Sequence, residues 1–307
     1  MAYSRQQYQT RRRRKRRRPL KVFFYVTLLF ATFLIGHAFG SRSSTDSVPT
    51  AHFPYSATST NTLDNFIFPH FTAQVPITEI TDTQYLKLVN RDRAVAMTNY
   101  SQLVTAWPDI PVRATYIQIH ETAMHAMLRL FEAAERANID NLFITSGFRS
   151  YDEQSRLYEN AANSAYVMRP GHSEHQLGLA ADILSTNSTA EMIGTQEAQW
   201  LAENAPQFGL ILRYPYDKHD ITNVPYEPWH FRYVGRVHAW IMGQYGFVLE
   251  EYIEFLQEHG NYTTTFENQA FYISYQKPRN GILFVPEHLD FTVSSANTGG
   301  YIVTAWE

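Results

Sequence analysis

Apolar side chains recur at helical spacing along the segment from Thr115 to Ala137. One stripe consists of Ile117, Met124, Leu128 and Phe131, and Ala123, Met127, Leu130 and Ala134 widen it. Residues three, four and seven positions apart share one face of an α-helix, so this spacing indicates a face packed on a core. The pattern therefore predicts an amphipathic helix over the whole of 115–137.

The residues that follow predict a strand and a second helix. The apolar run Asn141–Thr145 is short and typical of a buried strand. Ser150 stands three residues before Glu153, which is the spacing of a capping box, so a helix is expected from Ser150 to about Asn163. Further helices are predicted over Glu197–Ala205, Arg236–Tyr245 and Leu249–Glu258, and a further strand over Gly209–Arg213.

The pattern changes to that of a β-structure after Asn261. Four segments rich in aromatic and β-branched residues follow one another: AFYISYQ, GILFVPE, LDFTVSS and GGYIVTAW. Asn280-Gly281, a dipeptide that favours tight hairpin turns, lies between the first two. Residues 261–307 are therefore predicted to form a small β appendage of three or four strands.

The composition supports a folded core and limits the chemistry. The chain has 307 residues, of which 44% are hydrophobic and 15% aromatic, enough for one or two domains. It contains no cysteine, which excludes disulfides, cysteine-based zinc sites and a thiol nucleophile. A bound metal must therefore be held by His, Asp or Glu.

The net charge of −3 hides a strong partition along the chain. Ten of the 26 Lys and Arg lie within residues 1–21, which hold no Asp or Glu, so 16 basic residues face all 29 acidic ones beyond Lys21. The basic run leads directly into an apolar stretch that begins at residue 22. This order is typical of a secretory signal or signal anchor with its basic end inside, and not of nucleic-acid binding.

We therefore expect the chain to work outside the cytoplasmic membrane. A retained anchor over residues 22–40 is the favoured interpretation, and cleavage after Gly40 is the alternative because Ala38-Phe39-Gly40 resembles a signal-peptidase site. The predicted organisation is a basic cytoplasmic tail (1–21), the anchor (22–40), a linker rich in Ser, Thr and Pro (41–75), a globular domain (76–260) and the β appendage (261–307).

Polar residues with the potential to bind a metal gather in the stretch GHSEHQLGLAAD, residues 171–182. His175 and Asp182 are seven residues apart and would lie on opposite faces of an ideal strand, but a turn or bulge near Gly178 could bring them together. By spacing alone, His175 could equally be an ordinary buried histidine. His172 is the nearest alternative ligand.

A second polar cluster is EPWH, from Glu227 to His230. Two His and one Asp from the two clusters would supply three protein ligands and leave one position open, which is the pattern of catalytic zinc. Zinc lowers the pKa of bound water to about 7. Glu227 would then be a spare carboxylate near the metal, suited to take a proton from water and pass it to a leaving amine.

Three ordered motifs resemble the zinc D-alanyl-D-alanine carboxypeptidases of the VanY type. They are SGFRSYDEQSRLY (146–158), RPGHSEHQLGLAADI (169–183) and EPWHFRYVG (227–235). The resemblance extends over roughly residues 76–258. It implies zinc ligands at His175, Asp182 and His230, with Glu227 as the general base.

The resemblance also implies residues that hold the substrate. Arg149 would be a cationic anchor, since a guanidinium can bind a carboxylate in bidentate fashion or stabilise an oxyanion. Gln154 and Ser173 occupy positions that the family associates with substrate binding. From the residues alone, Gln154 could equally be an exposed helix residue and Ser173 a turn former.

The fold implied is α+β: a compact domain with a small antiparallel sheet that carries the zinc site, as in the Hedgehog/D-Ala-D-Ala-peptidase fold, plus the appendage. The activity implied is removal of the terminal D-Ala from peptidoglycan stem peptides. An L,D-carboxypeptidase acting on tetrapeptide stems is the alternative, ahead of an endopeptidase or a non-catalytic wall-binding protein. We interpret the aromatic residues of 261–307 as the core of a small sheet and not as a wall-binding surface.

Overall fold

The computed structural model describes residues 68–95, 102–161, 165–187 and 192–307. The predicted basic tail, the segment 22–40 and most of the predicted linker lie outside these residues. Within the described ranges, no helix has both the length and the apolar character needed to cross a bilayer.

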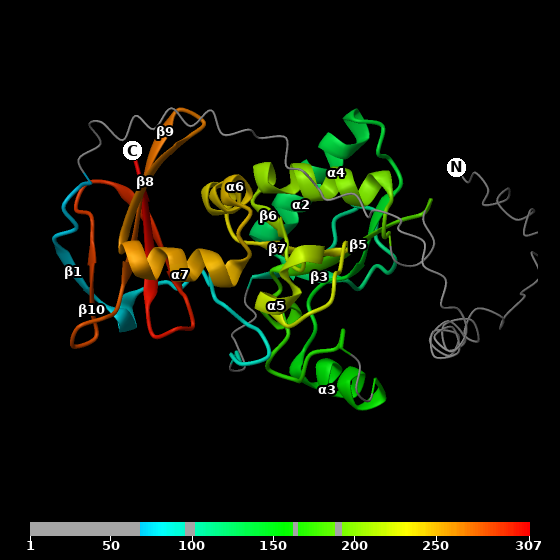
Figure 1. Ribbon diagram of the computed structural model, residues 1–307, viewed down its shortest axis with the longest axis horizontal. Coiled ribbons are helices and arrows are strands. Elements are labelled where there is room, and N and C mark those ends of the chain that lie inside the picture. The colour runs from blue at the N-terminus through cyan, green and yellow to red at the C-terminus, as the bar shows by residue number, and fades with distance from the viewer. Residues whose placement is uncertain (1–67, 96–101, 162–164, 188–191) are drawn as a thin grey trace, which may run out of the picture. The chain divides into compact units, whose positions relative to one another are not determined.

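A four-stranded antiparallel sheet forms the centre of the domain (Figure 1). Its strands, in spatial order, are β4 (Leu142–Ser146), β5 (Ala180–Ser185), β7 (His230–Tyr233) and β6 (Leu210–Leu212). Together with the helices described below, it confirms the predicted α+β class with a small antiparallel sheet.

Two helices pack with one face of this sheet in a single hydrophobic core. They are α2 (Glu121–Arg136), which buries Met124 and Met127, and α4 (Gln196–Asn204). Ile183 of β5 and Phe231 of β7 belong to the same core and are fully buried. Because side chains alternate along a strand, the residues directly before and after Ile183 and Phe231 in their strands point to the opposite face.

The remaining elements complete the domain. They are β2 (Leu103–Thr105), β3 (Gln118–His120), α3 (Tyr151–Asn160), the 3-10 helices η3 (Glu174–Leu177), η4 (Ala205–Phe208) and η5 (Tyr216–Lys218), and the helices α5 (His219–Thr222), α6 (Arg236–Tyr245) and α7 (Leu249–His259). The predicted capping box at the start of α3 is present, with Ser150 accepting from Glu153 N and Glu153 accepting from Ser150 N. The bounds of α6 agree with the predicted helix over 236–245.

The predicted helix over 115–137 is wrong at its N-terminal end. Gln118–His120 is the strand β3, which pairs with β2, and the helix begins at Glu121. The His120 side chain accepts a hydrogen bond from Thr122 N and so caps the first turn. The helical pattern extended too far because Ile117 is also buried in the core.

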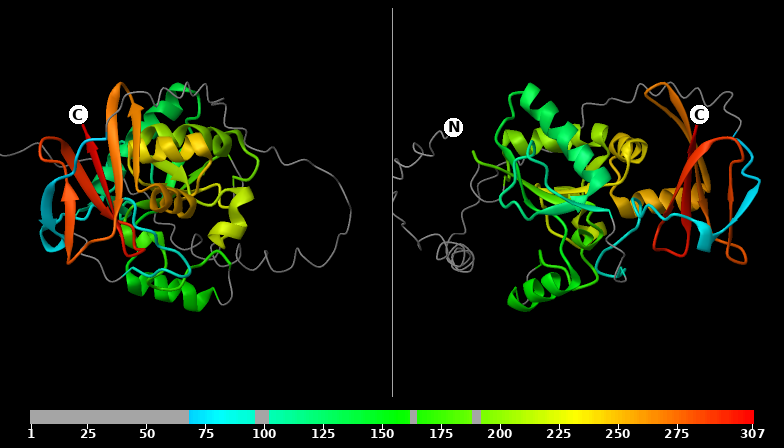
Figure 2. Two further views of the ribbon diagram at one scale, coloured as in Figure 1. Left: turned by 60° about the vertical axis from the view of Figure 1, so that its left-hand side comes forward. Right: turned by 180° about the vertical axis from the view of Figure 1, so that it is seen from behind.

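The C-terminal region contains five strands, more than predicted (Figure 2). Four form an antiparallel sheet in the order β11 (Asp290–Ser295), β12 (Tyr301–Trp306), β9 (Gln269–Gln276) and β8 (Asn261–Phe266). The strand β8 was not predicted. The fifth strand, β10 (Ile282–Val285), pairs instead with β1 (Ala73–Pro76), which a 3-10 helix, η2 (Ile77–Glu79), follows.

The pairing of β1 with β10 corrects the predicted end of the linker. Ala73 and Val75 pack against a buried cluster that contains Leu283 and Val285, so the chain is part of the β appendage before residue 76. The predicted linker over 41–75 therefore ends too late. Four residues of alternating character are too few to stand out before their pairing partner is known.

The Asn280-Gly281 turn forms, but it does not make a regular hairpin. Both residues have positive φ, 53° and 74°, and the turn joins Arg279 to Ile282. The flanking strands β9 and β10 belong to different sheets. The Gln276 side chain bridges them, because its Nε2 donates to Phe284 O (2.7 Å) and its Oε1 accepts from Phe284 N (2.9 Å).

Aromatic residues of the appendage pack against the globular domain. Phe266, Phe271 and Tyr275 contact a buried cluster that includes Leu249 and Ile253 of α7. The interpretation as core filling thus holds for these three residues, whereas Phe284 and Phe291 are exposed.

Gly178 ends η3 in a left-handed conformation, with φ of +70°, and a Cβ there would lie 2.6 Å from Leu103 Cδ2. We expect Gly178→Ala to lower the free energy of unfolding by about 2–3 kcal/mol, since backbone strain and overpacking add. Gly246 has φ of +66° with no atom within 4 Å, so Gly246→Ala should cost only about 1 kcal/mol. Equal losses in urea denaturation would contradict the close contact.

Candidate metal centre

The strands β5 and β7 place Asp182 directly opposite His230 in the antiparallel register. Both side chains point away from the core formed by Ile183 and Phe231. His230 Nδ1 lies 3.1 Å from Asp182 Oδ1. The pairing of two strands therefore brings together two of the predicted ligands, which are 48 residues apart in the chain.

His175 reaches the same point from η3. The stretch 174–182 is not one strand: the turn at Gly178 separates η3 from β5, as the presence of glycine suggested. His175 Nε2 lies 3.4 Å from Asp182 Oδ1. Among the described residues, the group with metal-ligand spacing is His175, Asp182 and His230, whose ligand atoms all lie within 4.8 Å of one another.

The His175 ring is oriented by the SGFR turn. Its Nδ1 donates to Gly147 O over 2.6 Å, so Nε2 carries the lone pair that faces Asp182. That Nε2 is buried and has no hydrogen-bond partner. Gly147 allows the turn to pack closely against β3, because a Cβ at position 147 would meet Gln118 O at 2.4 Å.

The ligand atoms of His175, Asp182 and His230 fit a zinc ion. An unpartnered buried nitrogen, a carboxylate oxygen and a second imidazole are the ligand types that zinc takes in catalytic sites. Burial lowers the pKa of His175 to about 4, with Arg149 adding to the effect, so its ring is neutral as a ligand must be. Burial also acts to lower the pKa of His230, but hydrogen bonds to Asp182 and Glu174 outweigh it and raise that pKa to about 9.

Glu227 lies beside this group and is almost fully buried, with 5% of its surface exposed. Its Oε2 is 3.8 Å from His230 Nδ1, and its backbone N donates to Tyr214 O. Burial raises the pKa of Glu227 to about 7, although His230 opposes this. A carboxyl group that titrates near neutral pH can both accept and return a proton.

Arg149 follows β4 and lies on the other side of Asp182. Its NH2 is 3.6 Å from Asp182 Oδ2, and its NH1 donates to Gln154 Oε1 over 2.9 Å. Its Nε is buried without a partner, and 22% of the side chain is exposed. The guanidinium therefore keeps donors available next to the three candidate ligands.

Gln154 is fully buried and is not the exposed helix residue considered above. Its Oε1 accepts from Arg149, and its Nε2 donates to Met168 O over 2.6 Å. Both ends of the amide are thus occupied, which makes Gln154 a support for Arg149. Its direct contact with substrate stays a prediction.

Ser173 and His172 precede η3. Ser173 is buried, 4% exposed, and stands at the N-terminus of η3 without a side-chain capping bond. His172 Nδ1 lies 2.8 Å from Asn90 O, and His172 is not in the group with metal-ligand spacing. The structure therefore does not favour His172 as the alternative ligand.

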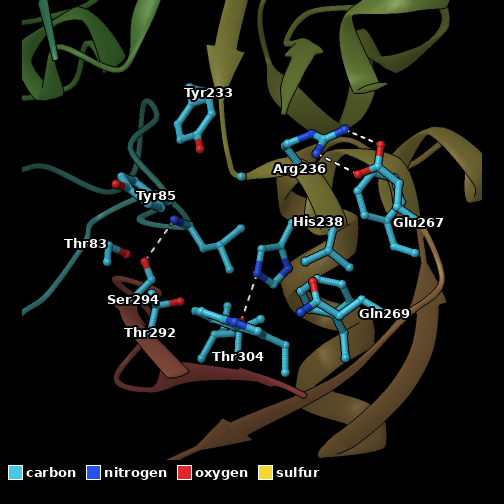
Figure 3. Close-up of a pocket in the computed structure, with 17 residues that line it drawn as sticks. Thr83, Tyr85, Tyr233, Arg236, His238, Glu267, Gln269, Thr292, Ser294 and Thr304 are labelled. Atoms are coloured by element: carbon cyan, nitrogen blue, oxygen red, sulfur yellow. Dashed lines mark hydrogen bonds and ion pairs between the residues drawn. The ribbon is translucent and has the colours of Figure 1, made fainter. Parts of the chain in front are cut away.

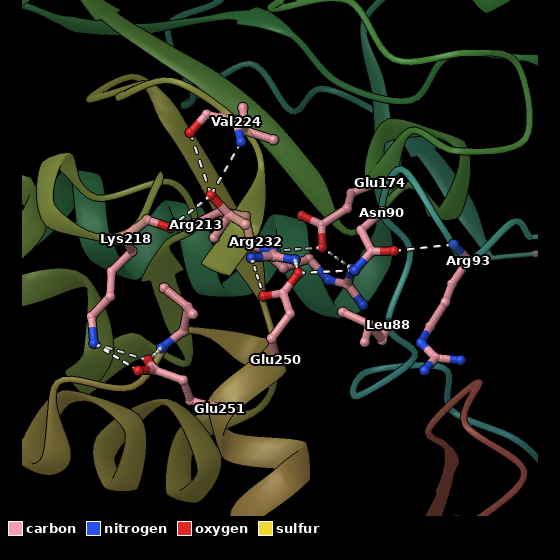
Figure 4. A network of polar contacts seen from close by, with 12 residues as sticks. Leu88, Asn90, Arg93, Glu174, Arg213, Lys218, Val224, Arg232, Glu250 and Glu251 are labelled. Atoms are coloured by element: carbon pink, nitrogen blue, oxygen red, sulfur yellow. Dashed lines mark hydrogen bonds and ion pairs between the residues drawn. The ribbon is translucent and has the colours of Figure 1, made fainter. Parts of the chain in front are cut away.

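A buried charge network that was not predicted from the sequence lies next to this centre (Figure 4). Glu174, Arg213 and Arg232 are 0–1% exposed, and Glu250 of α7 is 9% exposed. Burial opposes ionisation of Glu174, but Arg213 and Arg232 hold its pKa well below the usual range. The residue that points to such a network is Arg232, two positions after His230. A charged side chain in a buried strand requires a partner of opposite charge.

A cavity of about 310 Å³ lies elsewhere, between α6 and the C-terminal sheet (Figure 3). His238 in its wall is already paired, with Nδ1 against Tyr252 OH and Nε2 against Thr304 Oγ1. The cavity is lined by none of the three candidate ligands or Glu227. This cavity is therefore separate from the candidate metal centre.

Comparisons with known proteins agree with this centre. The family model described as D-alanyl-D-alanine carboxypeptidase, VanY, matches residues 116–236. A D-alanyl-D-alanine carboxypeptidase of Enterococcus faecium is 31% identical over 297 residues, which cover 93% of this chain and 96% of that protein.

Solved structures show the same similarity. The vancomycin resistance D,D-dipeptidase VanXYg is 30% identical with a TM-score of 0.67, covering 76% of this chain and 98% of that one. The LD-carboxypeptidase LdcB is 33% identical with a TM-score of 0.51, covering 57% of this chain and 97% of that one. Fold and relatives together define a hydrolase of the metallocarboxypeptidase class. The chain belongs to the VanY family of D-alanyl-D-alanine carboxypeptidases, which confirms the resemblance.

We expect Gln154→Leu to lower the free energy of unfolding by about 2–4 kcal/mol, because Met168 O and Arg149 NH1 lose their partner in a buried place. Gln199 lies on the exposed face of α4, so Gln199→Leu should change it by less than about 0.5 kcal/mol. Urea denaturation of both variants is the measurement. Similar small losses would show that the Gln154 amide does not support Arg149.

Proposed function

We propose that this chain removes the terminal D-alanine from peptidoglycan stem peptides ending in D-Ala-D-Ala, with zinc held by His175, Asp182 and His230. The observation that carries the proposal is the convergence of three ligand atoms within 4.8 Å, with the buried Glu227 and the partly exposed Arg149 beside them. The family to which the chain belongs supports the substrate.

In this proposal zinc supplies Lewis-acid chemistry, polarising the scissile carbonyl and making water more acidic. Glu227 accepts a proton from the attacking water and returns it to the amine nitrogen of the departing D-alanine. Its raised pKa, about 7, suits both transfers. The proton that leaves the water is thus the one that the amine gains.

Arg149 holds the reacting end of the peptide. Its unused donors bind the C-terminal carboxylate or the oxygen on which negative charge develops. Gln154 keeps the guanidinium in place through Nη1, and Ser173 helps to hold the peptide end. Water-poor surroundings strengthen these contacts, since all three residues are buried or half-buried.

Cleavage of an L,D bond in tetrapeptide stems is the second candidate. The similarity to the LD-carboxypeptidase LdcB, at 33% identity, supports this second candidate. The chemistry at the metal would be unchanged, and the two activities differ in the residue on the acyl side of the bond. A non-catalytic wall-binding protein would not need a proton-accepting carboxylate such as Glu227, which is buried beside the candidate ligands.

The proposed location is outside the cytoplasmic membrane. The support is the basic run of residues 1–21 followed by the apolar segment 22–40, which would act as an anchor or, if cleaved after Gly40, as a signal peptide.

The purified full-length chain should release D-alanine from a stem pentapeptide ending in D-Ala-D-Ala. We expect a zinc chelator to abolish the release and added zinc to restore it, with free D-alanine as the measured product. Release from the tetrapeptide alone would make the enzyme an L,D-carboxypeptidase. Release from neither peptide by the zinc-loaded chain would refute both activities.

Glu227→Gln should lower kcat by about 10²–10⁴-fold, because the amide cannot accept the proton of water. Zinc content should stay at the wild-type level, since Glu227 is not a ligand in this assignment. His230→Ala is the matched control, and it should lose the metal as well as the activity. Near-normal turnover by Glu227→Gln would show that another group is the base.

A further inference from the structure

We propose that Glu174 is a positioning residue for the metal centre: it holds the His230 ring so that Nε2–H donates to Glu174 and Nδ1 faces the metal. This inference rests on the zinc site proposed above. Glu174 precedes the ligand His175 in the chain but acts on the other histidine.

The two nitrogens of His230 face different carboxylates. Nδ1 lies 3.1 Å from Asp182 Oδ1, and Nε2 lies 3.4 Å from Glu174 Oε2. His230 is 4% exposed, so bulk water does not reach a misplaced ring nitrogen. A metal ligand needs its lone pair on one nitrogen and the hydrogen on the other, and an acceptor at the second nitrogen selects that arrangement.

The carboxylate of Glu174 is itself fixed by two buried arginines (Figure 4). Oε1 accepts from Arg213 Nε over 2.8 Å and from Arg232 NH1 over 2.9 Å. Arg232 NH2 in turn donates to Tyr85 O (3.1 Å) and Lys87 O (3.2 Å). The side chain therefore cannot turn away from His230 without breaking this set of contacts.

The two carboxylate oxygens of Glu174 have different partners, which distinguishes a positioning residue from one that only neutralises the charge of the arginines. Glu250 pairs with Arg213 through both oxygens, Oε2 to NH1 (2.8 Å) and Oε1 to NH2 (2.7 Å). Glu174 instead uses one oxygen for both arginines and presents the other to His230. Glu250 thus belongs to the same network without touching a metal ligand, which makes it a matched control.

The decisive variant is Glu174→Gln, which keeps the size of the side chain. With its oxygen on the arginines, the amide would point its NH2 group at His230 Nε2 and favour the hydrogen on Nδ1, where the metal binds. We expect the zinc dissociation constant, measured by competition with a chromophoric chelator, to rise about 10–100-fold. Glu250→Gln should change it less than about threefold, although both variants should unfold at lower urea concentration.

Several outcomes would overturn the proposal. Wild-type zinc affinity in folded Glu174→Gln, or an equal loss in Glu250→Gln, would make Glu174 a structural residue only. If the wild-type chain itself binds no zinc, the proposed function fails too. Zinc binding by the wild type with no effect of Glu174→Gln would refute only the role of Glu174.

A second measurement needs no variant and so does not depend on folding of Glu174→Gln. Nitrogen-15 NMR of the zinc-loaded wild-type chain, labelled at histidine, reports which ring nitrogen binds metal and which carries hydrogen. We expect metal on Nδ1 and hydrogen on Nε2 of His230. Metal on Nε2 would refute the role assigned to Glu174.

Discussion

The antiparallel register of β5 and β7 is the constraint on which the candidate metal centre depends. It sets Asp182 opposite His230 on one face of the sheet and sends Ile183 and Phe231 into the core on the other face. A slip of one residue would exchange the two faces, burying the ligands in the core and exposing apolar side chains. The hydrophobic core and the candidate site are therefore specified by the same pairing, and neither can change without the other.

The paired charges beneath the sheet extend this dependence to distant parts of the chain. Arg213 and Arg232 are fully buried and would be costly without Glu174 and Glu250 as partners. Because Glu250 belongs to α7, a helix that leads into the appendage also completes the surroundings of the metal centre. Leu249 of α7 also lies in one buried cluster with Ile273 and Ile302 of the C-terminal sheet, so hydrophobic packing joins the appendage to the domain as well. Residues 261–307 are thus packed on the domain as part of one folded unit.

The environments of three neighbouring groups push their pKa values apart. Burial lowers that of His175 and raises that of Glu227, whereas hydrogen bonds to carboxylates raise that of His230 despite burial. Divergent values within one cluster are characteristic of sites that divide roles between similar side chains. Here they agree with the proposed roles, in which His175 is a neutral ligand, Glu227 carries a proton near neutral pH and His230 releases a proton when metal binds.

The sequence by itself determined the family resemblance, because three short motifs stand in the same order and at the same spacing as in the VanY-type peptidases, and that resemblance predicted His175, Asp182 and His230 as ligands and Glu227 as the spare carboxylate. It also determined locally encoded features such as the capping box at Ser150. Only the tertiary structure decided which segments pair: the strand β3 within a helical pattern, β1 against β10, and the burial of Gln154 and Glu174. Each of these depends on a partner outside its own helix or strand, and local propensity carries no information about a partner that only folding brings into contact.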